Sequence, residues 1–88
     1  MTEAEFRQIL SNEGYPEPVE VTWAANSENA GHAHDFTAKG LVLEGSMKIT
    51  SDKSEQSCGP GDVFFMEAGT EHAEYIGDQD VRLLVGRR

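Results

Sequence analysis

The sequence predicts an all-β sandwich or barrel that is preceded by one short helix. After residue 18, seven or so short apolar stretches are separated by glycine-rich turns, which is the spacing of small all-β domains. No helical period lies between these stretches, so an alternating helix and strand architecture is disfavoured.

The length and composition predict one small domain over residues 1–88, with a helix and turn over 1–14 and the β-barrel over 19–85. A net charge of −9 disfavours nucleic acid and anionic membranes as partners. The single cysteine, Cys58, excludes an internal disulfide and favours a reducing compartment. The sequence has no apolar run near 18 residues, and its N-terminus has neither the basic region nor the apolar core of a signal peptide. We therefore expect a cytoplasmic location and no membrane contact.

The first element is a helix over Thr2–Ser11. Thr2 and Glu5 have the spacing of a capping box. Phe6, Ile9 and Leu10 form one apolar stripe, and we expect this stripe to pack across the outside of the core.

The strands of the first half follow from alternating side chains. Residues 19–23 alternate apolar and polar positions, 24–30 resemble a loop, and a bend is expected over 37–40. We expect strands over 41–44 and 47–50 to form a hairpin through the two-residue turn Gly45-Ser46, with Val42 opposite Ile49.

The second half continues in the same way. A turn is expected over 51–54 and a short polar strand over 55–58. The apolar run 63–66 is expected to be buried on both faces. A strand begins at His72, a closing strand spans 81–85, and residues 86–88 are expected to fray.

The three histidines carry the main functional signal. His32 and His34 are two residues apart, so on one extended strand both would point to the same side. His72, the third histidine, lies in the second half of the chain. We expect the fold to bring it back to the pair.

Two sequence motifs resemble those of the cupin superfamily. The first is Gly31-His32-Ala33-His34 followed by Gly45, and the second is Gly61-Asp62-Val63-Phe64-Phe65 followed by Ala68-Gly69-Thr70-Glu71-His72. This resemblance implies a small cupin-type jelly roll in which His32, His34 and His72 converge on one divalent transition metal. The family's usual glutamate ligand corresponds to Ala38, so the resemblance implies a site without that carboxylate. Imidazole suits zinc, iron, nickel or copper better than magnesium or calcium.

Two functions are consistent with these motifs. One is a metal-dependent enzyme acting on a small molecule, of dioxygenase, isomerase or lyase type, with unknown catalytic residues. The other is a non-catalytic sensor or storage module for a metal or small ligand, which the short chain favours. In both cases we expect a homodimer, because sheet edges would otherwise be exposed.

Several other polar residues lie near the motifs. Five acids could orient a histidine or act as a base, namely Asp35, Glu44, Glu67, Glu71 and Glu74, but in a chain with 16 acids each is expected to be a solvated surface group. Lys39 is expected on the surface, and Cys58 lacks a neighbouring histidine that would support nucleophilic chemistry.

Overall fold

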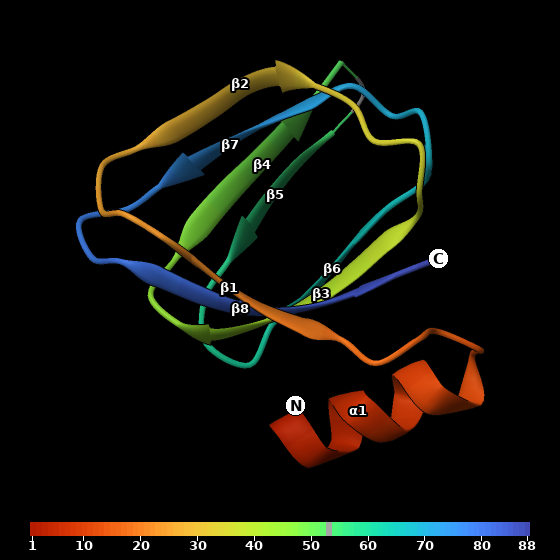
Figure 1. Cartoon of the computed structure of the whole chain (residues 1–88). Coiled ribbons are helices and arrows are strands. Elements are labelled where there is room, and N and C mark those ends of the chain that lie inside the picture. The colour runs from red at the N-terminus through yellow and green to blue at the C-terminus, as the bar shows by residue number, and fades with distance from the viewer. Residues whose placement is uncertain (53) are drawn as a thin grey trace.

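The structure is a computed structural model that describes residues 1–52 and 54–88, except for the side chains of Ala30 and His32. Two four-stranded antiparallel sheets face each other, and one helix lies outside the first of them (Figure 1). The elements are α1 (Glu3–Asn12), β1 (Val19–Trp23), β2 (Glu28–His32), β3 (Ala38–Glu44), β4 (Met47–Ser51), β5 (Glu55–Cys58), β6 (Val63–Met66), β7 (His72–Ile76) and β8 (Val81–Arg87).

The sheets have the strand orders β1-β8-β3-β6 and β2-β7-β4-β5. Neighbouring strands are mostly distant in sequence, which is the pattern of a jelly roll. The predicted fold class, an all-β jelly roll with a short N-terminal helix, is confirmed.

Apolar side chains form two separate layers. The larger cluster lies between the sheets and includes Val42, Ile49, Phe64 and Leu83. The smaller cluster lies between the first sheet and α1, where Leu41 and Leu84 meet the helix. Because adjacent strand residues point to opposite faces, β3 and β8 serve both layers.

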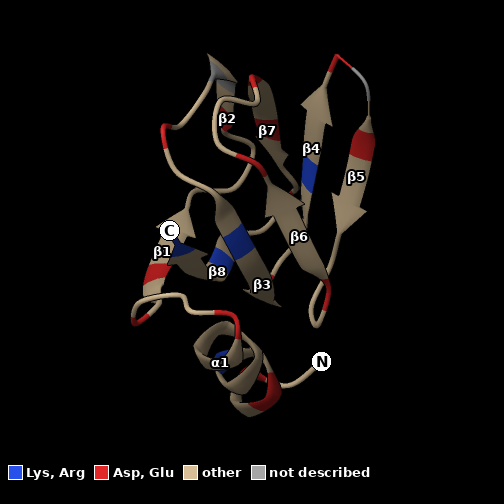
Figure 2. Cartoon of the chain, turned by 90° about the vertical axis from the view of Figure 1, so that its right-hand side faces the viewer, with Lys and Arg blue, Asp and Glu red and all other residues tan. Residues whose placement is uncertain are grey.

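Helix α1 packs on the outer face of the first sheet, as its apolar stripe predicts (Figure 2). The Thr2 hydroxyl accepts the Glu5 N–H at 3.2 Å, and the Glu5 carboxylate accepts the Thr2 N–H at 2.9 Å. These two bonds are the predicted capping box. Phe6 and Leu10 are fully buried under the helix, and Lys39 on β3 pairs with Glu13 at its end.

The predicted hairpin across Gly45-Ser46 is wrong. β3 pairs with β6 and β8, whereas β4 pairs with β5 and β7. The chain crosses here from one sheet to the other. Gly45 has φ +80°, and a Cβ at this position would collide with the Asp80 carbonyl. Val42 and Ile49 still meet in the same core, but from opposite sheets.

Two predicted loops or bends are also corrected, and a predicted turn is not tested. The loop expected over 24–30 contains the start of β2, and the bend expected over 37–40 contains the start of β3. The bend lies instead at Asp35 and Phe36. The turn expected over 51–54 includes Lys53, which lies outside the described residues.

Burial and order differ from expectation at two further places. The run 63–66 is not buried on both faces, since Phe65 is 45% exposed on the outer side of the edge strand β6. The C-terminal residues do not fray. Strand β8 continues to Arg87, and Arg88 exchanges two backbone hydrogen bonds with Thr37, at 2.8 and 3.0 Å.

Within the part of the chain that the structure describes, no helix has the length and hydropathy needed to span a bilayer.

Candidate metal centre

Strand β7 directs a histidine and a carboxylate into the space between the sheets. His72, Glu74 and Ile76 are buried at alternate positions, as one face of a strand requires. His72 is 3% and Glu74 is 2% exposed. A buried carboxylate is costly unless it is paired or bound to a cation, so Glu74 needs a partner in the interior.

His72 supplies that partner, and both of its ring nitrogens lie near oxygen atoms. Nδ1 is 2.9 Å from the Thr70 carbonyl oxygen, and Nε2 is 3.1 Å from Glu74 Oε1. The carbonyl only accepts, so Nδ1 carries a proton. A proton or a metal ion must then lie between Nε2 and an ionised Glu74 for that contact to be attractive.

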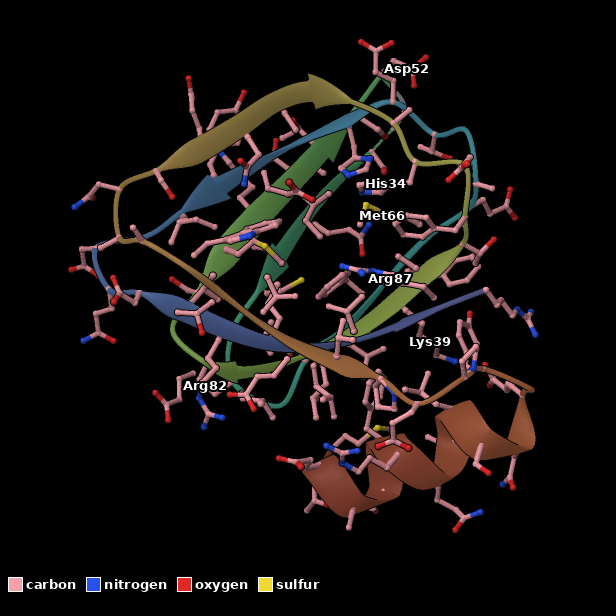
Figure 3. The ribbon with its side chains drawn as sticks, in the orientation of Figure 1. His34, Lys39, Asp52, Met66, Arg82 and Arg87 are labelled. Atoms are coloured by element: carbon pink, nitrogen blue, oxygen red, sulfur yellow. The ribbon has the colours of Figure 1, made fainter. Side chains whose placement is uncertain are left out.

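His34 reaches the same interior from the segment between β2 and β3. Its ring centroid is 5.1 Å from that of His72 and 4.6 Å from that of Phe36, on which it stacks. Figure 3 shows His34 between the two sheets, near Met66. Two imidazoles that bind one ion at about 2.1 Å in tetrahedral geometry have centroids about 5.2 Å apart, so the described pair meets this requirement.

The histidine pair does not lie on one continuous strand, contrary to expectation. β2 ends at His32, Gly31 has φ +56°, and the pairing with β7 shifts between Asn29 and His32. The backbone of His32 is registered opposite His72. The His32 side chain, and with it the prediction that it ligates a metal, lies outside the described part of the chain.

The described side chains do not by themselves form a metal cluster. Among them, no group of three or more histidine, cysteine, aspartate or glutamate side chains is arranged to hold an ion. The described elements of the centre are therefore the neighbours His34, His72 and Glu74, together with the backbone position of His32.

An interior cavity of about 150 Å³ adjoins these residues. Its polar lining consists of His34, Glu74 and Arg87, and the remaining nine lining residues are apolar, including Trp23 and Ala38. Ala38 corresponds to the expected glutamate position. Glu74 therefore brings a carboxylate from the opposite sheet into the cavity that Ala38 lines.

The other acids near the motifs are exposed, as expected, namely Asp35, Glu44, Glu67 and Glu71. Glu74 is the exception, and its prediction as a surface acid is wrong. Its two-residue spacing from His72 is the sequence signal that could have revealed it.

Cys58 is buried, and burial, with a smaller effect from Asp62, raises the pKa of its thiol, which disfavours a nucleophilic role.

Comparison with known proteins agrees with this architecture. Two four-stranded sheets with histidines directed between them define a cupin-type jelly roll. The cupin domain family model Cupin_2 matches residues 19–86, and this chain belongs to that family. No curated protein matches the sequence significantly.

Solved structures include two similar proteins with named activities. The DMSP lyase DddQ of Ruegeria pomeroyi is 26% identical, with a TM-score of 0.71, over 78% of this chain and 36% of its own. The polyketide cyclase RemF of Streptomyces resistomycificus is 28% identical, with a TM-score of 0.66, over 88% of this chain and 58% of its own. This chain thus spans about a third to three fifths of these relatives.

A third similar structure supports the fold alone. It is a cupin superfamily protein from Desulfitobacterium hafniense, which is 23% identical with a TM-score of 0.66 over 75% of this chain and 60% of its own.

Proposed function

We propose that this cupin domain binds one divalent transition metal through His32, His34 and His72, with Glu74 as the carboxylate of the site, and that a small molecule occupies the adjoining cavity. The observation that carries the proposal is the paired geometry of His72 and Glu74.

That geometry fits two ligands of one ion. Ligand atoms bound at about 2.1 Å and separated by angles of 90–109° lie about 3.0–3.4 Å apart. The observed distance from His72 Nε2 to Glu74 Oε1 is 3.1 Å. The bond from Nδ1 to the Thr70 carbonyl is the outer contact that metal-bound imidazoles commonly make, and it leaves the Nε2 lone pair to the ion.

The histidines and the carboxylate together favour particular metals. Imidazole suits zinc, iron, nickel and copper, and a set that mixes histidine with one carboxylate is found in non-haem iron and zinc enzymes. Magnesium and calcium prefer all-oxygen sites. When bound, such an ion supplies Lewis acidity or a site for a substrate.

The class of reaction has less support than metal binding. Two of the similar proteins, at 26% and 28% identity, are named as a lyase and a cyclase, which favours small-molecule enzymes over the sensor or storage alternative. That alternative draws support from the cavity, because about 150 Å³ is below the range of about 300–1,000 Å³ typical of ligand pockets. We therefore propose metal and ligand binding as the function, with a dioxygenase, isomerase or lyase reaction as its enzymatic form.

Metal analysis tests the proposal. Protein purified without chelator or nickel affinity resin is loaded with zinc or iron(II) and assayed by elemental analysis, together with His34→Ala and Glu74→Gln. We expect about one ion per chain in the wild type. Each variant should lose at least about 10–100-fold in affinity, since that is the usual cost of changing even an outer partner of a metal ligand. Glu71→Gln changes an exposed acid and should bind like the wild type.

A cobalt-loaded sample supplies a second measurement. Its visible absorption reports on the ligand set even if the loaded protein is inactive, and Glu74→Gln should shift that spectrum. Wild-type protein that binds none of zinc, iron, nickel or copper would contradict the proposal. Equal binding by His34→Ala would contradict the assigned ligands.

We also propose that the chain is a cytoplasmic homodimer. Support comes from two exposed apolar residues on the edge strands of the first sheet, Val19 on β1 and Phe65 on β6, which are 43% and 45% exposed. Light scattering after size-exclusion chromatography should give twice the 9.7 kDa chain mass, and the mass of a single chain would refute the dimer.

A further inference from the structure

The inner face of β8 carries one charged residue among apolar ones. Val81, Leu83 and Val85 belong to the core between the sheets, and Arg87 continues the same alternation. Its backbone is paired with Ala38 of β3. The guanidinium carbon lies 5.3 Å from the centroid of the Phe36 ring. Figure 3 shows the Arg87 side chain on the same side of its sheet as His34 and Met66, although Arg87 as a whole is exposed.

Arg87 differs from most other cations of this acidic chain. The described residues Arg7, Lys39, Lys48 and Arg82 each form an ion pair with glutamate. Among the residues that the structure describes, Arg87 has no carboxylate within ion-pair distance, although the sequence holds 16 acids. Its neighbour Arg88 points the other way, over Tyr15, and donates a hydrogen bond to the Glu13 carbonyl.

The Arg87 side chain lines the cavity that adjoins the candidate metal centre. Arg87 lines the same space of about 150 Å³ as Glu74 and His34. The walls between them are apolar and partly aromatic, with Trp23 and Phe64 among them. An apolar cavity of about this volume holds a molecule the size of benzene.

The charges on the lining restrict the ligand further. A guanidinium binds a carboxylate through two parallel hydrogen bonds. Glu74 is a second, negative group on the same cavity. In the metal-free protein it would repel a ligand that carried another anionic group toward it, whereas a divalent ion bound at Glu74 would remove this repulsion.

We propose that this cavity binds a small monocarboxylic acid with a compact apolar or aromatic body, whose carboxylate pairs with Arg87. The body then fills the space between the sheets and its far end approaches His34. This inference builds on the proposed function, because it identifies the class of the small molecule that adjoins the metal centre.

Binding of benzoate tests the proposal, with benzamide as a neutral analogue, phthalate as a diacid and acetate as an acid without a body. Each is titrated into the full chain, with and without added zinc, and followed by amide chemical shifts in ¹H–¹⁵N spectra. Without zinc, we expect benzoate to bind at least about tenfold more tightly than benzamide or acetate, because a charge-assisted pair and the apolar contacts each contribute about that factor. We expect phthalate to bind more weakly than benzoate in the metal-free protein, because its second carboxylate faces Glu74.

Arg87→Met keeps much of the side-chain volume but removes the charge. Arg88→Met is its matched control, because Arg88 follows β8 and its side chain lies over Tyr15, away from the cavity. Benzoate affinity should fall at least about tenfold in Arg87→Met and stay within about twofold of the wild type in Arg88→Met. Shift changes should gather at Phe36, Phe64 and Leu83. Equal affinities for benzoate in the wild type and Arg87→Met would overturn the inference, as would equal affinities for benzoate and acetate.

The outcomes separate this inference from the metal proposal. Benzoate binding that depends on Arg87 in a protein that takes up no metal would retain the ligand class and reject the metal. Uptake of metal by a protein that binds no benzoate at millimolar concentration would retain the metal and reject the ligand class.

Discussion

Gly40 on β3 is the position where a single methyl group should disturb the interior most selectively. Gly40 is registered opposite Phe64 of β6. A Cβ at residue 40 would lie 2.5 Å from Cε1 and 2.7 Å from Cε2 of the Phe64 ring, and closer still to Cζ. The ring thus covers the glycine, an arrangement in which an aromatic residue compensates for the missing side chain.

The expected cost of Gly40→Ala follows from these distances. Ordinary contact begins near 3.4 Å, so the ring tip would have to withdraw by about an ångström within a core where Phe64 is 3% exposed. Overpacking of this kind lowers the free energy of unfolding by about 1–3 kcal/mol. Replacing a glycine within a strand by alanine raises it by about 0.5–1 kcal/mol. We expect a net loss of about 1–2 kcal/mol, which lowers the melting temperature by roughly 4–16 °C.

A double-mutant cycle identifies the cause. Phe64→Leu removes the ring, so Gly40→Ala in the Phe64→Leu background should be neutral or slightly stabilising. Urea unfolding of the four proteins should give a coupling free energy of about 1–3 kcal/mol. If Gly40→Ala costs the same free energy with and without the ring, the contact with Phe64 does not limit this position.

Three further predictions concern the helix and the cysteine. Thr2→Ala should lower stability by about 1 kcal/mol at pH 7, measured by urea unfolding. The hydrogen bond from the Thr2 backbone lowers the pKa of Glu5, so its contribution is complete above the pKa of a free glutamate and is lost as pH falls through the lower folded-state pKa. The stability difference between the wild type and Glu5→Gln should therefore shrink on acidification, and a constant difference would argue against the capping contact. Because burial raises the pKa of Cys58, a disulfide reagent at pH 8 should react with it far more slowly than in urea, and equal rates would contradict its burial.

The local elements could be predicted because each is specified by neighbouring residues. The capping box and the stripe of Phe6 and Leu10 both lie within one short segment, and they define α1 and its buried face. In the same way, the alternation of Val81, Leu83 and Val85 marks the inner face of β8. Such signals act over two to four residues, which is the range that a sequence pattern reports.

The pairing of strands could not be predicted in this way. Gly45 has the positive φ that a hairpin turn needs, but the same conformation allows the chain to cross between sheets against Asp80. Whether Gly45 forms a hairpin turn or a crossing depends on the strands with which β3 and β4 pair, which are β8 and β7. These pairings join residues that are dozens of positions apart, so the turn sequence alone does not determine them.

The candidate site could be predicted from the sequence only in part. Its motifs indicated His34 and His72, whose rings are neighbours in the fold, but the acid near them was assigned to the surface. Composition supports that assignment for a typical glutamate, since most acids are solvated. Strand geometry overrides it at Glu74, because a residue two positions after an inward His72 on the same strand also points inward.

This inward carboxylate changes how the missing glutamate at Ala38 is understood. β3 and β7 belong to different sheets, and Ala38 and Glu74 line one cavity from opposite sides. A carboxylate can therefore reach the same interior from either sheet, and the small Ala38 side chain leaves room for the one on β7. A motif compares residues only at fixed positions along the chain, whereas a metal ion or ligand responds to the atoms that surround it. The absence of a glutamate at residue 38 therefore does not mean that the cavity lacks a carboxylate.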